Sequence, residues 1–136
     1  MAQPPKYYSE IIGIRHQLGL DTSATLLNML SHSIQNGNIH IFTFANSRPI
    51  GYVAWISLNK EAFRMALKTH ALPPYMHEWN EGHLTLIYDV CFLNNWGSVA
   101  KQQLIALMRK KHFFAYFKRR RIGAFYRQKG KLKRCH

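Results

Sequence analysis

The chain has 136 residues, a formal net charge of +13 at pH 7, 47% hydrophobic residues and 13% aromatic residues. This composition excludes an intrinsically disordered chain, and the length predicts a single domain over residues 1–136 with a core of its own. No apolar run reaches the roughly 18 residues that a membrane-spanning helix needs, and residues 1–8 carry no apolar signal core, so the sequence predicts a cytoplasmic protein.

The first quarter of the chain predicts two helices. Residues 9–20 predict a short helix or a turn that carries His16. The segment Asp21-Thr22-Ser23 offers N-cap side chains for a second helix over about residues 23–35, in which apolar residues share one face. Asn36-Gly37-Asn38 is a turn signal and should end this helix.

A hairpin and a third helix are expected next. Ile39–Phe44 and Ile50–Ile56 read as two strands, and the turn signal Asn46–Pro49 between them indicates a hairpin. Asn59 is a candidate N-cap for a helix over about residues 60–70.

The remaining elements complete an alternation of helices and strands. We expect a buried strand over 84–92, the longest helix over 98–117, a short strand over 122–126 and a frayed basic tail over about 127–136. Helices packed on a mixed sheet make an α+β fold.

Cysteine and histidine usage predicts neither a disulfide nor a metal site. The two cysteines, Cys91 and Cys135, lie far apart in the sequence, and no C-x-x-C pair is present. The eight His residues are scattered without metal-ligand spacing. We therefore expect no metal and no tightly bound cofactor.

One acidic residue stands out because of its surroundings. The chain has six acidic residues, and Asp89 alone lies inside an apolar run, Leu84–Leu93, which follows Trp79-x-x-Gly82. A carboxylate in such a strand must be hydrogen-bonded or paired, because burying it alone costs several kcal/mol. Asp89 is therefore a candidate functional residue, with a structural ion-pair role as the alternative.

The basic charge is concentrated at the C-terminal end. All six acidic residues precede residue 101, whereas Lys and Arg continue to residue 134. Such one-sided charge favours an acidic partner, which could be nucleic acid, anionic lipid or an acidic protein, and a solvated basic face is the simplest alternative.

Several segments stand in an order and at a spacing typical of one known family. They are Leu27-Asn-Met-Leu30, Arg48–Trp55 followed by Ile56–Glu61, Trp79-x-x-Gly82 ahead of Asp89, Met108–Lys111, and Gly123 with Lys129-Gly130-Lys131. Together they resemble the toxin-activating lysine acyltransferases, the enzymes that mature RTX haemolysins. The resemblance covers roughly residues 26–134.

The resemblance implies a fold, a reaction and partners. The family has an N-acetyltransferase-like (GNAT-like) fold and transfers a fatty acyl chain from acyl carrier protein to internal lysines of a pro-toxin. Acyl carrier protein is strongly acidic, so a basic face would speed its association in a salt-sensitive way. The family resemblance and the aromatic C-terminal helix also suggest a homodimer. The candidate docking residues for the carrier are Arg109, Lys110, Lys111, Lys118, Arg119, Arg120 and Arg121.

The family uses a His and an Asp, and the Asp carries over to Asp89. His16 lies at about the family's distance before Asn28, although the family's Ser-Pro-x-His motif is absent around it. An alternative alignment pairs Ile12-Gly13 with a family Leu-Gly and places the motif near Thr22–Thr25, where no His stands. His16 is then a surface residue, and the chain is a non-catalytic member that binds its target.

Two other interpretations remain open at this stage. Aromatic residues interleave with the charges of the C-terminal half, which is typical of proteins that stack on single-stranded nucleic acid. Cys91, two residues after Asp89, is a conceivable nucleophile, although buried apolar cysteines are usually inert.

Overall fold

The structure is a computed structural model that describes residues 4–44, 48–69, 82–93, 97–109, 113–118, 121–128 and 131–134. The chain divides into two compact units, each built from two separate segments of sequence. The first unit comprises Met1–Ala54 and Val90–Leu104, and the second comprises Trp55–Asp89 and Ile105–His136.

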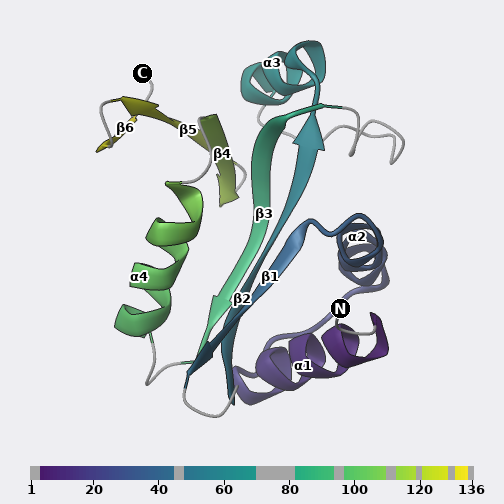
Figure 1. The fold of residues 1–136 in the computed structure, drawn as a ribbon. Helices are drawn as coiled ribbons and strands as arrows, with labels where there is room; N and C mark the ends of the chain where they lie inside the picture. Colours follow the sequence, from purple (N-terminus) through teal and green to yellow (C-terminus); the bar gives the residue numbers. More distant parts are fainter. Residues whose placement is uncertain are drawn as a thin grey trace. The chain divides into compact units, whose positions relative to one another are not determined.

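Two helices open the first unit (Figure 1). Helix α1 (Pro4–Gln17) begins earlier than the predicted residue 9, and proline suits a first helical turn because its missing N–H has no partner there. Helix α2 (Ala24–Gln35) confirms the second prediction, with Ser23 as N-cap and Asn36 as C-cap. Gly37 follows with a φ of 71°, a left-handed conformation that favours glycine.

The start of α2 depends on one side-chain hydrogen bond. Ser23 Oγ accepts from the Leu26 backbone N–H at 3.1 Å. We expect Ser23→Ala to lower the free energy of unfolding by about 1 kcal/mol, because that N–H loses its cap. Urea denaturation measures the change. The control is Ser31→Ala, which removes only a bond from Ser31 Oγ to the Leu27 carbonyl at 2.9 Å and should change stability by less than about 0.5 kcal/mol. Equal losses in the two variants would contradict the cap.

The predicted hairpin is confirmed in the first unit. Strand β1 (Ile39–Phe44) pairs antiparallel with strand β2 (Arg48–Leu58), whose residues are buried along most of its length. Gly51 allows close packing, because a Cβ there would stand 2.6 Å from the Cys91 carbonyl oxygen. The Leu93 N–H donates to the Ile50 carbonyl at 2.8 Å, which places the end of strand β3 (Leu84–Phe92) beside β2.

In the second unit, Asn59 begins a helix as expected. Its Oδ1 accepts from the Ala62 N–H at 2.8 Å, and helix α3 (Lys60–Thr69) follows. Phe63 and Ala66 form its buried side. Gly82 comes so close to the end of β2 that a Cβ on it would collide with the backbone of Leu58 and Asn59. This close approach explains the glycine of the W-x-x-G segment. Trp79 lies outside the described residues.

Strand β3 forms at the predicted residues, 84–92, and strand β5 (Arg121–Gln128) contains the predicted last strand. Strand β4 (Phe113–Lys118) pairs parallel with β3 over Thr85–Ile87 and antiparallel with β5. With the pairing of β6 (Lys131–Arg134) on β5, the order is β1-β2-β3-β4-β5-β6.

Two C-terminal predictions are wrong. The helix predicted over 98–117 ends early, because helix α4 (Gly97–Met108) is followed by β4. The sequence of β4, Phe-Phe-Ala-Tyr-Phe-Lys, is rich in aromatic residues, which favour strands once a partner is present. The tail predicted to fray from residue 127 instead pairs, with Gln128 opposite Lys131.

The architecture confirms the α+β class with helices and a mixed sheet. Among the described residues, no helix is both long and apolar enough to cross a membrane.

Candidate active site

Asp89 lies in β3 of the second unit, on an otherwise uncharged strand. Its side chain is half-buried, and the residues two positions away on the same strand face, Ile87 and Cys91, are buried. Asp89 is the only acidic residue in the six described strands. A carboxylate held in a strand and partly open to solvent can both hydrogen-bond a basic group and keep its negative charge.

His16 lies in the last turn of α1, and its side chain is exposed. Its carbonyl oxygen accepts from the Gly19 N–H at 3.0 Å, where Gly19 has a φ of 67° and the chain turns away from the helix. The His16 ring is open to solvent. His16 belongs to the first unit and Asp89 to the second, so their pairing stays a prediction.

The residue next to His16 forms a buried polar cluster that the sequence did not reveal. Arg15 is 7% exposed, and its Nη1 donates to Tyr52 Oη at 3.2 Å. The same nitrogen lies 3.8 Å from Cys91 Sγ, and that thiol donates to Tyr52 Oη at 3.3 Å. Three side chains from α1, β2 and β3 thus meet within the first unit.

Further hydrogen bonds hold the Arg15 guanidinium in place. Its Nε donates to Thr22 Oγ1 at 2.9 Å, and its Nη2 donates to the Asp21 carbonyl oxygen at 2.5 Å. A buried guanidinium needs such partners because its desolvation is costly. The cluster fixes the C-terminal end of α1 against the strands, and with it the position of His16.

Arg15 was missed because a basic residue in a short helix is ordinarily solvated. The available signal was its spacing: Ile11 and Ile14 lie four and one residues earlier, on the side of α1 that is buried. The cluster also bears on Cys91. Its thiol is buried and donates a hydrogen bond, which fits a structural cysteine better than a nucleophile.

The candidate docking residues are only partly described. Arg109 directly follows α4 and is exposed, with its backbone N–H donating to the Ile105 carbonyl at 2.9 Å. Lys118 ends β4 and Arg121 begins β5, and the register pairs them at the end of this hairpin. The other four proposed docking residues lie outside the described residues: Lys110, Lys111, Arg119 and Arg120.

Two further observations concern titratable groups. Partial burial lowers the pKa of His32 in α2, which favours the neutral ring, and its Nδ1 lies 3.2 Å from the Asn36 side-chain amide nitrogen. Over the described ranges, His, Cys, Asp and Glu side chains do not gather into a group that could hold a metal ion.

The assignment of this site rests on the chain's own residues. The catalytic roles of His16 and Asp89 stay predictions; the structure places His16 at the exposed end of a helix and Asp89, half-buried, in a strand. Comparison with known proteins does not extend it, because no protein-family model and no curated protein matches this chain.

Proposed function

We propose that this protein is a protein-lysine fatty acyltransferase with a GNAT-like fold. It takes a fatty acyl chain from acyl carrier protein and transfers it to internal lysines of a protein target, an RTX pro-toxin. The observation that carries the proposal is Asp89, the one acidic residue of the described strands, half-buried between apolar neighbours. A protein that only binds nucleic acid has no need of a carboxylate there.

The chemistry requires a base and a group that orients it. A lysine ammonium is protonated at neutral pH and cannot attack a thioester until it loses a proton. His16 is the candidate that accepts this proton, and Asp89 favours the charged imidazolium that results. The lysine nitrogen then forms a bond to the acyl carbon and the carbon–sulfur bond breaks. The proton lost by the new amide nitrogen goes to the leaving thiolate, so the carrier leaves as a thiol, and the His16 imidazolium returns its proton to water.

An alternative order of steps uses the same residues. The imidazole of His16 attacks the thioester first, the carrier thiol leaves, and the acyl-histidine then passes its acyl group to the lysine. This ping-pong route predicts a transient mass increase on the protein itself, which direct transfer does not produce.

The net charge of +13 supports the choice of donor. An acidic carrier would be attracted over a distance of about a Debye length, roughly 8 Å at physiological salt. Exposed Arg109 is the described candidate docking residue with the clearest placement. Transfer should therefore slow as salt is raised, through a weaker encounter between the two proteins.

The test incubates the purified protein with acyl-loaded carrier protein and a candidate pro-toxin, with products measured by intact mass. Asp89→Asn and His16→Ala should each slow transfer by about 100-fold or more. The matched controls are Asp21→Asn and His40→Ala, which change exposed residues and should leave the rate within about twofold.

The other outcomes separate the competing interpretations. Full activity in Asp89→Asn would overturn the proposed site, and full activity in His16→Ala would move the base elsewhere. Carrier binding without transfer at any chain length would identify a non-catalytic binding protein. Salt-sensitive binding to nucleic acid with neither transfer nor carrier binding would overturn the proposed function.

A further inference from the structure

An open pocket of about 650 Å³ lies beside α3 in the second unit, and neither His16 nor Asp89 lines it. It is formed by α3, by the end of β2 and by the segment that leads into β3. Gly82 forms part of its lining, where its close approach to the Leu58 and Asn59 backbone leaves no room for a side chain. The pocket is therefore built by a feature that only glycine permits.

The interior of the pocket is apolar. Leu58 is fully buried and Phe63 is 4% exposed, while Leu67 and Leu84 are half-buried and face the remaining space. Four apolar side chains around one space favour an occupant with a hydrocarbon body. Each methylene buried there should strengthen binding by about fourfold.

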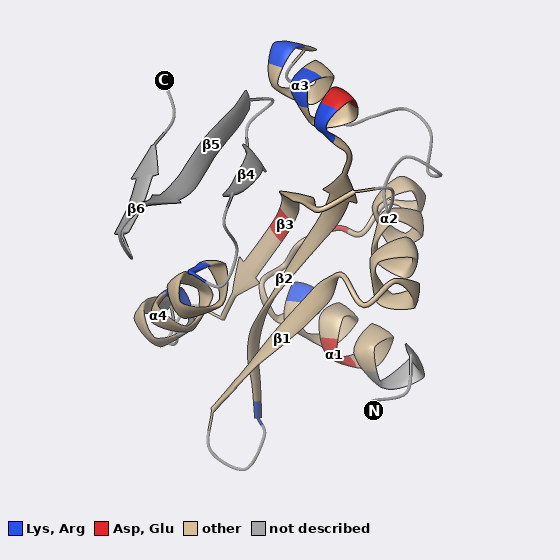
Figure 2. Cartoon of the chain, turned by 45° about the horizontal axis from the view of Figure 1, so that its top comes forward, with Lys and Arg blue, Asp and Glu red and all other residues tan. Residues whose placement is uncertain are grey.

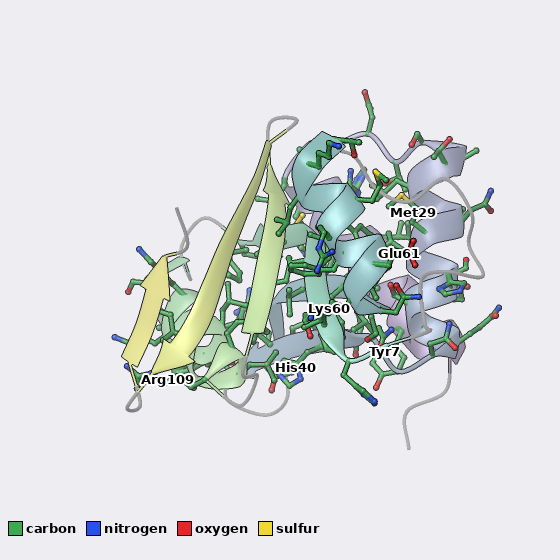
Figure 3. The ribbon with its side chains drawn as sticks, turned by 90° about the horizontal axis from the view of Figure 1, so that it is seen from above. Tyr7, Met29, His40, Lys60, Glu61 and Arg109 are labelled. Atoms are coloured by element: carbon green, nitrogen blue, oxygen red, sulfur yellow. The ribbon has the colours of Figure 1, made fainter. Side chains whose placement is uncertain are left out.

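The rim of the pocket is positively charged. Lys60, Arg64 and His83 contribute to its lining, and all three are exposed. Lys60 and Arg64 are four residues apart on α3, so they lie on the same side of the helix. Figure 3 labels Lys60 on this helix, and Figure 2 shows the basic residues that α3 carries. Among the described lining residues none is acidic, so the rim complements an anion.

We propose that this pocket binds a long-chain fatty carboxylate, with its hydrocarbon chain along Leu58, Phe63 and Leu67. The carboxylate accepts hydrogen bonds from the Lys60 and Arg64 side chains. The charge complementarity of the rim and the apolar lining together define this occupant. This pocket does not include the residues of the proposed acyl transfer. The proposed binding of a fatty carboxylate does not depend on whether the protein transfers acyl groups.

Calorimetric titration of the full chain with laurate tests the proposal. Laurate should bind in the micromolar range, and Lys60→Gln with Arg64→Gln should weaken it by about tenfold. Lauryl alcohol should bind about tenfold more weakly than laurate, and butyrate should not bind detectably. The matched control is Lys68→Gln, which removes a cation from α3 outside the pocket lining and should leave affinity unchanged.

A second variant tests the apolar part of the pocket without touching the buried core. Leu67→Gln places a polar group among the lining side chains and should weaken laurate binding by about tenfold. Circular dichroism of each variant verifies that the fold is retained.

The proposal is overturned if laurate does not bind, or if the double variant and Lys68→Gln bind it equally. Equal binding of laurate and lauryl alcohol would overturn the role of the cationic rim. Binding to anionic vesicles without binding of laurate would identify a membrane surface as the occupant instead. Acyl transfer that persists without laurate binding would reject this pocket while leaving the proposed function intact.

Discussion

Gly82→Ala is expected to lower the free energy of unfolding by about 3 kcal/mol. The added methyl group would collide with the backbone of Leu58 and Asn59, and neither can move without disturbing the end of β2 and the start of α3. Overpacking a rigid site costs roughly 1–3 kcal/mol, and a clash with backbone falls at the upper end. Urea denaturation of the two proteins measures the difference.

Gly13→Ala is the matched control for this prediction. Gly13 lies inside α1, and a Cβ on it would meet nothing within 4 Å. Alanine is the better helix former, so this variant should gain about 0.5–1 kcal/mol. The opposite signs separate the clash from the general effect of replacing glycine. A loss below about 1 kcal/mol in Gly82→Ala would contradict the close approach.

Arg15→Met is the second change with a large expected effect, a loss of about 3 kcal/mol. Methionine retains much of the packing but none of the hydrogen bonds to Tyr52, Thr22 and the Asp21 carbonyl. Hydrogen bonds that involve a charged group contribute roughly 1.5–3 kcal/mol each. The variant no longer buries a charged guanidinium, and the desolvation cost that it avoids offsets part of that total. Thermal or urea unfolding provides the measurement.

Tyr52→Phe distinguishes the cluster from simple packing. It removes only the phenolic oxygen, which accepts from Arg15 and from the Cys91 thiol, and should cost about 1–2 kcal/mol. Because both changes act on one cluster, the double variant should lose less than the sum of the two single losses. Arg48→Met, at an exposed position in β2, should change stability by less than about 0.5 kcal/mol. Strict additivity would show that Arg15 and Tyr52 do not interact.

The Arg15 cluster also has a consequence for the proposed reaction. Arg15 and His16 are adjacent in the last turn of α1, one buried and the other exposed. The hydrogen bonds of Arg15 fix the backbone at this helix end, and if His16 is the base, less ordering of that backbone is needed during reaction. Arg15 is thus a positioning residue in this scheme.

Local signals in the sequence determined much of the fold. Ser23 and Asn59 marked the starts of α2 and α3 because a cap acts within three residues of itself. The strands β1, β2 and β3 followed from apolar runs bounded by turn residues, and Asp89 was identified as unusual because it interrupts one of those runs.

Tertiary structure decided what depends on partners far away in the sequence. Phe113–Lys118 forms a strand rather than a continuation of α4, because Thr85–Ile87 and β5 supply its hydrogen-bond partners. Arg15 is buried because Tyr52 and Cys91, 37 and 76 residues away, provide polar atoms for its guanidinium. Gly82 is needed because the backbone of Leu58 and Asn59 passes directly against it. Each of these is a contact between distant segments, which neither helix propensity nor hydrophobic periodicity encodes.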